Sequence, residues 1–451
     1  MAVDLARETA LKTLYDIMEK GAYSNIALNK HLEQPEMNSM DRAFITELVY
    51  GTVKWKLSID WIIQQFSKVK LKKISPWVLN ILRLGVYQIM YTDRIPESAA
   101  CNESVKLAKK YGHSASSGYV NAVLRNIVRN RDQIPYPDGN KEYERYLSIK
   151  YSHPEWMVRQ WVSRYGRDFT ESLLVSNNEI PDFTVRVNTL KVSRDQLIDE
   201  LEANSVKARK GRYADEAVIL ENPSSITKLD AFKKGYFQVQ DESSMLVGIV
   251  LDPQPGELVM DVCSAPGGKA THLAQRMQDK GTVIARDIHE HKVALIKEAA
   301  DRLGLAIIKP EVFDALEIDN NYIGKADRVL VDAPCTGLGI IRKKPDIKWA
   351  RNEKDKTEIV KLQTEIINAA SKYVKPGGVL VYSTCTIEPE ENEEVVRRFV
   401  ENNRDFKTVD ISDVLPKELD KKSAKEGYIQ LYPNIDGVDG FFIAKLVKGD
   451  K

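Results

Sequence analysis

The stretch LVMDVCSAPGGKATHLA (258–274) contains a strand, a glycine loop and the start of a helix in direct succession. The run LVMDV (258–262) is short and apolar, as a buried strand would be, and Gly267 and Gly268 separate it from a helical pattern. Such glycines let the backbone approach a ligand closely, and the N-terminus of the following helix attracts negative groups. This order is typical of the first unit of a sheet whose strands alternate with helices.

The same rhythm continues toward the C-terminal end. The clearest intervening helix lies in EIVKLQTEIINAASKYVKPGG (358–378), with one apolar stripe and Pro-Gly-Gly as its stop, and GFFIAKLVK (440–448) adds a strand that we expect to be antiparallel. These patterns predict a mostly parallel, doubly wound, Rossmann-like sheet. Its expected strands lie in LVMDV (258–262), TVIARD (282–287), AIIKP (306–310), RVLVDA (328–333) and GVLVYS (378–383).

Two other kinds of pattern precede this sheet, and 451 residues are too many for one compact core. The N-terminal part is helical throughout, and Trp77–Tyr91, apolar on most faces, is expected to be the central helix of a bundle. Prolines and Asp138-Gly139 indicate a linker, and FTVRVNTLK (183–191) indicates a strand among helices. The predicted divisions are an all-α domain (1–135), a linker (136–145), a small α+β domain (146–235) and the α/β domain (236–451).

Charge and cysteine content restrict the class of protein. Residues 1–135 hold 19 Lys and Arg against 13 Asp and Glu, while the whole chain has a net charge of +1. A basic front half indicates either a polyanion-binding module or a solvated helical surface, and charge alone leaves both readings open. The four scattered cysteines have neither disulfide nor metal-ligand spacing, and no signal peptide is recognisable. We therefore expect a metal-free, cytoplasmic, monomeric protein without a membrane span.

Acidic residues at strand ends point to a cofactor. Asp261 would repel a pyrophosphate, and the loop after it is neither a dinucleotide fingerprint nor a phosphate loop. A ligand with a carboxylate and an ammonium fits better, such as the methionine part of S-adenosylmethionine. Asp287 ends the second strand, where an acid can bind ribose hydroxyls, and Asp314 follows in EVFDAL (311–316), where it can face adenine. Each acid alone is commonly a helix cap, but three at successive strand ends favour a cofactor site.

Two of the cysteines stand where strands end. Cys335 lies in LVDAPCTGLG (330–339) and Cys385 in LVYSTCTIEPEENEEV (380–395). Methyl transfer to C5 of a pyrimidine needs a thiolate that adds to C6, because C5 is otherwise a poor nucleophile. Asp332, three residues before Cys335, is placed to engage the ring N3 and the exocyclic amine. A lone strand-end cysteine is usually a small hydrophobe, but two beside the cofactor loop favour catalysis.

The motifs DVCSAPGGKATHLA, LVDAPCTGLGIIRKKPDIKW and VYSTCTIEPEENEEVV resemble the signature motifs of the RsmB/Sun family of RNA 5-cytosine methyltransferases. RVNTLK, GYFQVQDESSMLV and DGFFIAKLVK extend the likeness, and the helical front resembles the NusB-type RNA-binding domain, so the resemblance covers nearly the whole chain. The small α+β domain would then be RRM-like, although it lacks the aromatic RNP signature. One departure is Lys269-Ala270-Thr271, where the family more often has Lys-Thr directly; we expect it to alter a helix surface only.

The resemblance also implies roles. Cys385 is similar to the family's nucleophile and Cys335 to the cysteine that helps to release product, whereas spacing alone does not decide which cysteine attacks. Lys269 is expected to reach toward the target base. The implied S-adenosylmethionine-binding positions are Cys263, Ser264, Ala265, Pro266, Gly267, Gly268, Lys269, Asp287, Asp314 and Asp332.

The expected substrate is small-subunit ribosomal RNA, with an unpaired or flipped cytosine as its target. Two alternatives remain: the same chemistry on tRNA, and a non-catalytic RNA-binding assembly or antitermination factor, which would have no need of the cysteines and the glycine loop. The candidate RNA-binding side chains are Lys70, Lys72, Lys73, Arg125, Arg129, Arg342, Lys343 and Lys344.

Overall fold

A computed structural model describes residues 3–33, 37–221, 223 and 225–450, which form two compact units. One unit contains residues 1–179 and 341–350, and the other contains residues 180–340 and 351–451. Among the helices of the described chain, none has the length and apolar character that crossing a bilayer requires.

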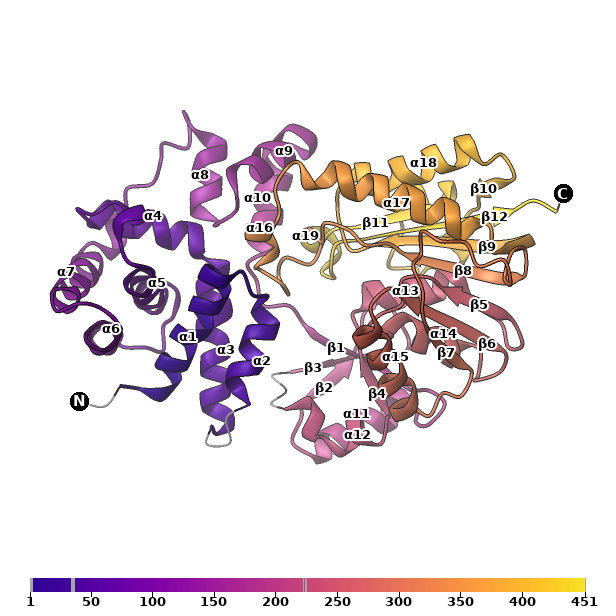
Figure 1. The fold of residues 1–451 in the computed structure, drawn as a ribbon, viewed down its shortest axis with the longest axis horizontal. Coiled ribbons are helices and arrows are strands. Elements are labelled where there is room, and N and C mark those ends of the chain that lie inside the picture. The colour runs from indigo at the N-terminus through magenta and orange to yellow at the C-terminus, as the bar shows by residue number, and fades with distance from the viewer. Residues whose placement is uncertain (1–2, 34–36, 222, 224, 451) are drawn as a thin grey trace. The chain divides into compact units, whose positions relative to one another are not determined.

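The first unit is all-α (Figure 1), as the sequence predicts. Gly21 ends α1 in a left-handed conformation, and α5 is buried on most faces, as predicted for the central helix of a bundle. The helix α8 begins within the segment predicted as a linker. The helices are α1 (Leu5–Lys20), α2 (Ser24–Leu32), α3 (Ser39–Lys54), α4 (Lys56–Phe66), α5 (Pro76–Tyr91), α6 (Glu97–Tyr111), α7 (Ser116–Arg129), α8 (Tyr143–Lys150), α9 (Glu155–Tyr165), α10 (Arg167–Ser176) and α16 (Ile347–Ala350).

The second unit begins with a small antiparallel sheet of order β2-β3-β1-β4. Its helix α11 starts at a capping box, in which Ser193 and Gln196 satisfy each other's backbone N–H groups. The elements are β1 (Phe183–Val187), α11 (Arg194–Ala203), β2 (Ala208–Lys210), β3 (Ala217–Leu220), α12 (Asp230–Lys233) and β4 (Phe237–Val239).

A larger sheet of order β10-β12-β9-β8-β5-β6-β7 follows, and β11 pairs with β12. The strands from β9 to β7 run parallel, whereas β12 is antiparallel to β9, as the sequence predicts. The elements are α13 (Glu242–Leu251), β5 (Leu258–Asp261), α14 (Gly268–Arg276), β6 (Thr282–Asp287), α15 (Glu290–Leu303), β7 (Ile308–Val312), β8 (Ala326–Asp332), α17 (Asp355–Ser371), β9 (Val374–Thr384), α18 (Glu393–Asn402), β10 (Phe406–Thr408), β11 (Tyr428–Leu431), α19 (Pro433–Asp436) and β12 (Phe441–Lys448).

Successive residues of β5 face opposite sides of this sheet. Val259 packs in the core with α13, α14 and α15, whereas Met260 packs in the core with α17 and α18. The sheet is therefore doubly wound (Figure 1), and its strand order changes direction at β5, between β8 and β6. Ligands of such sheets bind at the carboxyl ends of the strands near this point.

Two local predictions were wrong. Pro376-Gly377-Gly378 does not stop a helix, because α17 already ends at Ser371 and the three residues lie inside β9, where Gly377 has φ +70° and the pairing with β8 shifts register. The insertion at Ala270 does not alter a helix surface, because its side chain is fully buried in the core.

Candidate active site

The two strand-end cysteines meet at the carboxyl edge of the sheet. Cys335 follows β8 and Cys385 follows β9, and because these strands are parallel neighbours, their loops leave on the same side. The two sulfurs lie 3.0 Å apart, and both thiols are free. After Cys385 the chain forms a short 3₁₀ turn, Pro389–Glu391, and α18 begins at Glu393.

The cysteine pair has an asymmetric environment. The hydrogen bond with Cys385, burial, and the nearby carboxylate of Glu391 together raise the pKa of the Cys335 thiol well above its ordinary value. Cys335 is therefore held in its protonated form while the Cys385 thiol remains beside it.

Lys269 and Asp332 form an ion pair in the same unit. Lys269 Nζ lies 2.7 Å from Asp332 Oδ2, and the Ser383 hydroxyl donates to Asp332 Oδ1 at 2.8 Å. Lys269 Nζ also lies 5.0 Å from the ring centroid of Phe441. Burial disfavours the charged amine, but the attraction of Asp332 outweighs it and raises the pKa of Lys269. A positive donor in the first turn of α14 and a hydrogen-bonded carboxylate at the end of β8 thus lie next to each other.

The loop after β5 lies among carboxylates. Four of them, Asp261, Asp332, Asp287 and Asp314, add to burial in raising the pKa of Cys263 well above its ordinary value. Asp261 is fully buried, and neither of its carboxylate oxygens has a hydrogen-bond partner among the described residues. Burial, then the charge of Asp332, raises the pKa of Asp261 to about 7. A buried carboxylate without a partner is costly, so this position suits a cationic or hydrogen-bond-donating ligand.

The backbone of the loop also suits a ligand. Gly267 has φ +97°, and a Cβ atom there would lie 3.1 Å from the Cα atom of Ile296, so only glycine fits. A Cβ atom on Gly268 would meet nothing within 4 Å, which leaves open space at the N-terminus of α14. Glycine, helix terminus and carboxylates together fit S-adenosylmethionine, which has a carboxylate, an ammonium, a positive sulfonium and ribose hydroxyls.

Asp287 and Asp314 are half-buried and have local backbone partners. Asp287 Oδ1 accepts from the His289 N–H at 3.0 Å, and Asp314 Oδ1 accepts from the Leu316 N–H at 2.9 Å. Each therefore caps its own turn, as an isolated strand-end acid commonly does. Backbone hydrogen bonds nevertheless place both acids beside the loop after β5. The Ser264 N–H donates to the Arg286 carbonyl at 2.7 Å, next to Asp287, and the Phe313 N–H, next to Asp314, donates to the Asp287 carbonyl at 3.1 Å.

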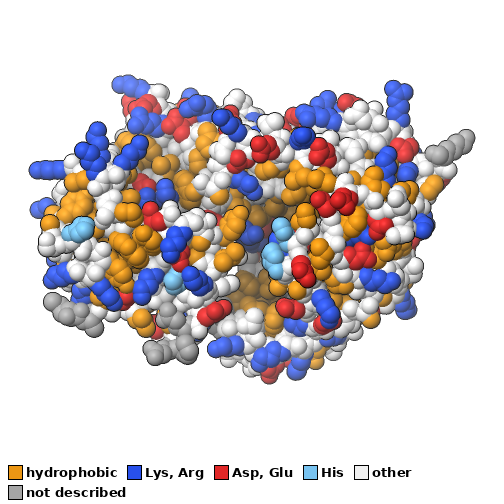
Figure 2. All heavy atoms as spheres, in the orientation of Figure 1, with side chains coloured by type: hydrophobic (Ala, Val, Ile, Leu, Met, Phe, Trp, Pro, Cys, Tyr) orange, Lys and Arg blue, Asp and Glu red, His pale blue; other side chains and the backbone are white. Residues whose placement is uncertain are grey.

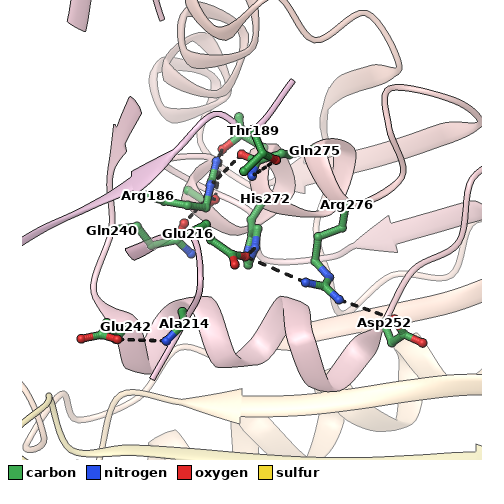
Figure 3. Close-up of polar contacts among 12 residues, drawn as sticks. Arg186, Thr189, Ala214, Glu216, Gln240, Glu242, Asp252, His272, Gln275 and Arg276 are labelled. Carbon is green, nitrogen blue, oxygen red and sulfur yellow. Dashed lines mark hydrogen bonds and ion pairs between the residues drawn. The ribbon is translucent and has the colours of Figure 1, made fainter. Parts of the chain in front are cut away.

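A buried arginine from the small sheet fixes the start of α14 (Figure 3). Arg186 of β1 donates to the Gly268 carbonyl at 2.8 Å, to Thr271 Oγ1 at 3.0 Å and to Gln275 Oε1 at 3.2 Å, and it also contacts Gln240. The motif RVNTLK therefore has a structural role, because its first residue holds the helix whose N-terminus forms the glycine loop.

Next to Arg186, a histidine and a carboxylate form a buried pair (Figure 3). His272 Nε2 lies 2.6 Å from Glu216 Oε1, and Arg276 lies between Glu216, at 3.9 Å, and Asp252, at 3.5 Å. Burial, opposed in part by Glu216, lowers the pKa of His272 to about 4. Although burial opposes its ionisation, the hydrogen bond with His272 lowers the pKa of Glu216 to about 2. The pair is thus a neutral imidazole that donates to a carboxylate.

The basic candidates are distributed over several elements. On the face shown in Figure 2, Lys and Arg side chains of the helical unit are spread among hydrophobic and acidic ones. Lys70, Lys72 and Lys73 are exposed around a 3₁₀ turn, and Arg125 and Arg129 are exposed on α7. The charged groups at these five positions are open to solvent.

The segment after the Pro-Cys motif belongs to the helical unit. Lys348 is fully buried there and donates to the carbonyls of Lys54 and Ser152, and Trp349 donates to the carbonyl of Val53. Of the candidate side chains in this segment, Arg342 is buried, Lys343 is half-buried and Lys344 is exposed. Lys348 and Trp349 therefore attach the end of this segment to the helical unit. The basic composition of the segment does not predict this structural role.

Three other side chains at the site were missed from the sequence. Ser383, Glu391 and Arg186 all lie inside motifs that the sequence analysis quotes for other reasons. Their contacts could not be predicted, because each of these side chains joins residues from different loops or strands.

Comparisons with known proteins agree with this architecture. Residues 248–447 match the family "16S rRNA methyltransferase RsmB/F", residues 4–129 match the NusB family, and residues 153–227 match the ferredoxin-like domain of RsmF/B-like methyltransferases. The chain is 41% identical to the probable ribosomal RNA small subunit methyltransferase B of Bacillus subtilis (strain 168), over 98% of each chain.

Solved structures extend the likeness. The crystal structure of PH0851 has a TM-score of 0.82 and 29% identity, covering 99% of this chain and 100% of that one. NSun6 from Pyrococcus horikoshii, solved with SFG, has a TM-score of 0.58 and 26% identity, covering 65% of this chain and 97% of that one.

The fold and the site thus define a Rossmann-like methyltransferase domain behind a NusB-type helical domain and a ferredoxin-like domain. The chain belongs to the RsmB/F family of 16S rRNA methyltransferases. The resemblance seen in the sequence and the predicted fold class are both confirmed.

Proposed function

We propose that this chain methylates C5 of one cytosine in 16S rRNA through a covalent adduct between Cys385 and C6. The observation that carries the proposal is the pair of sulfurs 3.0 Å apart at the carboxyl edge of a sheet that also carries the Lys269–Asp332 pair. Methyl transfer to nitrogen or oxygen has no use for such a thiol pair, whereas transfer to C5 needs a nucleophile and later a base.

The attack step uses the Cys385 thiolate. As the S–C6 bond forms, the electrons of the C5=C6 bond move into C4=C5 and those of C4=N3 move onto N3. The ammonium of Lys269, held by Asp332, stabilises the charge that develops at N3 and then gives N3 its proton, which leaves Lys269 as a neutral amine. The C5 atom of this enamine is then a carbon nucleophile.

S-adenosylmethionine, when bound, supplies the methyl group. Its proposed binding residues are those of the loop Cys263–Lys269 together with Asp287, Asp314 and Asp332. The relative NSun6, with SFG, and the family match support this assignment.

Cys335 is proposed as the base that takes the C5 proton. The Cys385 thiol is the first cause of the raised pKa of Cys335, and that influence ends once the Cys385 sulfur is bonded to C6. The Cys335 thiol then loses its own proton to solvent more easily, and the resulting thiolate accepts the C5 proton. Loss of the C5 proton re-forms the C5=C6 bond, the Cys385 thiolate leaves, and N3 returns its proton.

The NusB-type domain, with its basic balance, supports rRNA as the partner, and we propose that Lys70, Lys72, Lys73, Arg125, Arg129, Lys343 and Lys344 contribute phosphate contacts. Arg342, which the sequence also suggested, is not included because its side chain is buried. We further propose that the protein acts as a monomer in the cytoplasm.

The test uses methyl-labelled S-adenosylmethionine and unmodified 16S rRNA. We expect label at cytosine C5 with the wild type, loss of at least a thousandfold in rate with Cys385→Ala, and protein–RNA adducts with Cys335→Ala. Cys101→Ala, in the core of the helical unit, is the matched control and should retain activity.

Other outcomes would change the proposal. An active Cys385→Ala with an inactive, adduct-free Cys335→Ala would reverse the two roles. Methyl transfer to tRNA but not to rRNA would make tRNA the substrate. Tight rRNA binding without any methyl transfer would favour a non-catalytic assembly factor.

A further inference from the structure

Glu391 is a fully buried carboxylate next to the cysteine loops. It lies in the 3₁₀ turn Pro389–Glu391, after Cys385 and before α18. Among the residues that the structure describes, Glu391 forms no ion pair with a Lys or Arg, so its carboxylate depends on hydrogen bonds. Burial raises its pKa above the ordinary value. A buried acid without a cationic partner lowers the stability of the folded protein, so its hydrogen bonds must compensate for the missing cation.

The contacts of Glu391 join both cysteine loops. Its Oε2 accepts from the Thr336 N–H at 2.9 Å and from Gln363 Nε2 at 3.0 Å, and its Oε1 accepts from the Thr336 hydroxyl at 2.5 Å. The Thr386 hydroxyl lies 2.9 Å from Thr336 Oγ1 and 3.4 Å from Glu391 Oε1.

These threonines are the residues directly after the two cysteines. Thr336 follows Cys335 and Thr386 follows Cys385, and both side chains are buried. One carboxylate therefore connects the backbone of the Pro-Cys loop with the side chain of the Thr-Cys loop, one residue away from each sulfur.

We infer that Glu391 is a positioning residue that holds the two cysteine loops together and thereby sets the separation of the Cys335 and Cys385 sulfurs. The effect of Glu391 on catalysis rests on the proposed function. Its effect on the distance between the two sulfurs does not. Without Glu391, Cys385 still attacks C6, but Cys335 is no longer placed to take the C5 proton. Adduct formation is then retained and product release is slowed.

The geometric test uses phenylarsine oxide, which bridges two neighbouring thiols with loss of one water. Wild-type protein should bind one equivalent, and neither Cys335→Ala nor Cys385→Ala should bind in this way. We expect Glu391→Ala to bind the arsenical about tenfold more weakly, whereas Glu391→Gln, which keeps the shape and most hydrogen bonds, should stay within about threefold of the wild type. Glu394→Ala is the matched control, because Glu394 pairs with Arg398 on α18 and touches neither loop.

The catalytic test compares adduct with product. With rRNA and S-adenosylmethionine, the ratio of covalent adduct to methylated product should rise about tenfold in Glu391→Ala and remain near the wild-type ratio in Glu391→Gln. A general loss of folding would lower adduct and product together and leave their ratio unchanged.

The inference is overturned if folded Glu391→Ala binds the arsenical as tightly as the wild type. If Glu391→Ala does not fold, Thr386→Val replaces it, since the valine keeps the shape and removes the hydroxyl; unchanged arsenical binding by that variant overturns the inference too. If the wild type binds the arsenical but transfers no methyl group, the proposed function fails while the positioning role is still measured.

Discussion

Two buried polar networks in the catalytic unit differ in how their charges are compensated. In the network behind α14 (Figure 3), Arg186 has acceptor partners on every side, and Glu216 has His272 and Arg276 beside it. At the cysteine edge, Glu391 is fully buried but accepts hydrogen bonds from Thr336 and Gln363, whereas neither carboxylate oxygen of the fully buried Asp261 has a hydrogen-bond partner among the described residues.

The difference indicates different roles. A buried charge whose partners are all present holds two elements together, and removing one partner is strongly destabilising. A buried acid that lacks partners lowers the stability of the free protein, and is expected where a ligand or a reaction requires it. Arg186 therefore positions α14 and Glu391 positions the cysteine loops, whereas Asp261 is expected to meet a ligand.

The largest expected effect on stability concerns Arg186. We expect Arg186→Met to lower the free energy of unfolding of the second unit by about 3–5 kcal/mol, because its buried acceptors lose their donor. All six tryptophans lie in the helical unit, so Trp fluorescence follows that unit, and hydrogen exchange of α14 peptides follows the other. Arg209→Met, which breaks an exposed pair with Asp182, should cost at most about 1 kcal/mol. Equal effects of the two substitutions would remove the distinction.

The next largest effect concerns Asp261. Its pKa is raised to about 7 in the folded protein from an ordinary 3.8, so the folded state binds the proton more tightly. Stability therefore falls as pH rises from about 3.8 to 7, and the full cost is present above pH 7. Asp261→Asn should stabilise the cofactor-free protein at pH 8 by a few kcal/mol, on the order of 3, and by much less at pH 5.

The same substitution should weaken binding of S-adenosylmethionine, measured by calorimetry at pH 8. A variant that is more stable and binds less well would sharpen the comparison. An Asp261→Asn protein with unchanged stability at pH 8 would contradict the assignment of a costly buried charge.

The smallest effect concerns His272. Its pKa is lowered to about 4 from an ordinary 6.5, so the unfolded chain binds the proton more readily. Its contribution to stability is present above pH 6.5 and is lost as pH falls toward 4. We expect the second unit to lose about 1–2 kcal/mol between pH 7 and pH 5 through this group. In His272→Gln that part of the pH dependence should disappear, and an unchanged pH profile would exclude His272 as its source.

The sequence by itself determined much of this protein. Periodicity and glycine placement determined the helical front, the parallel strands and the glycine loop, because these features depend on neighbouring residues. The motifs identified the cysteines and the strand-end acids for the same reason, and the family comparison confirms the class of protein.

Only the tertiary structure decided which of those residues meet. The 3.0 Å separation of the sulfurs, the Glu391 bridge between Thr336 and Thr386, and the hold of Arg186 on α14 each join segments 50 or more positions apart. The register of β8 against β9 fixes the first two, and the packing of the small sheet on α14 fixes the third. Local patterns cannot encode such distances, because they arise from how whole strands and helices pack against one another.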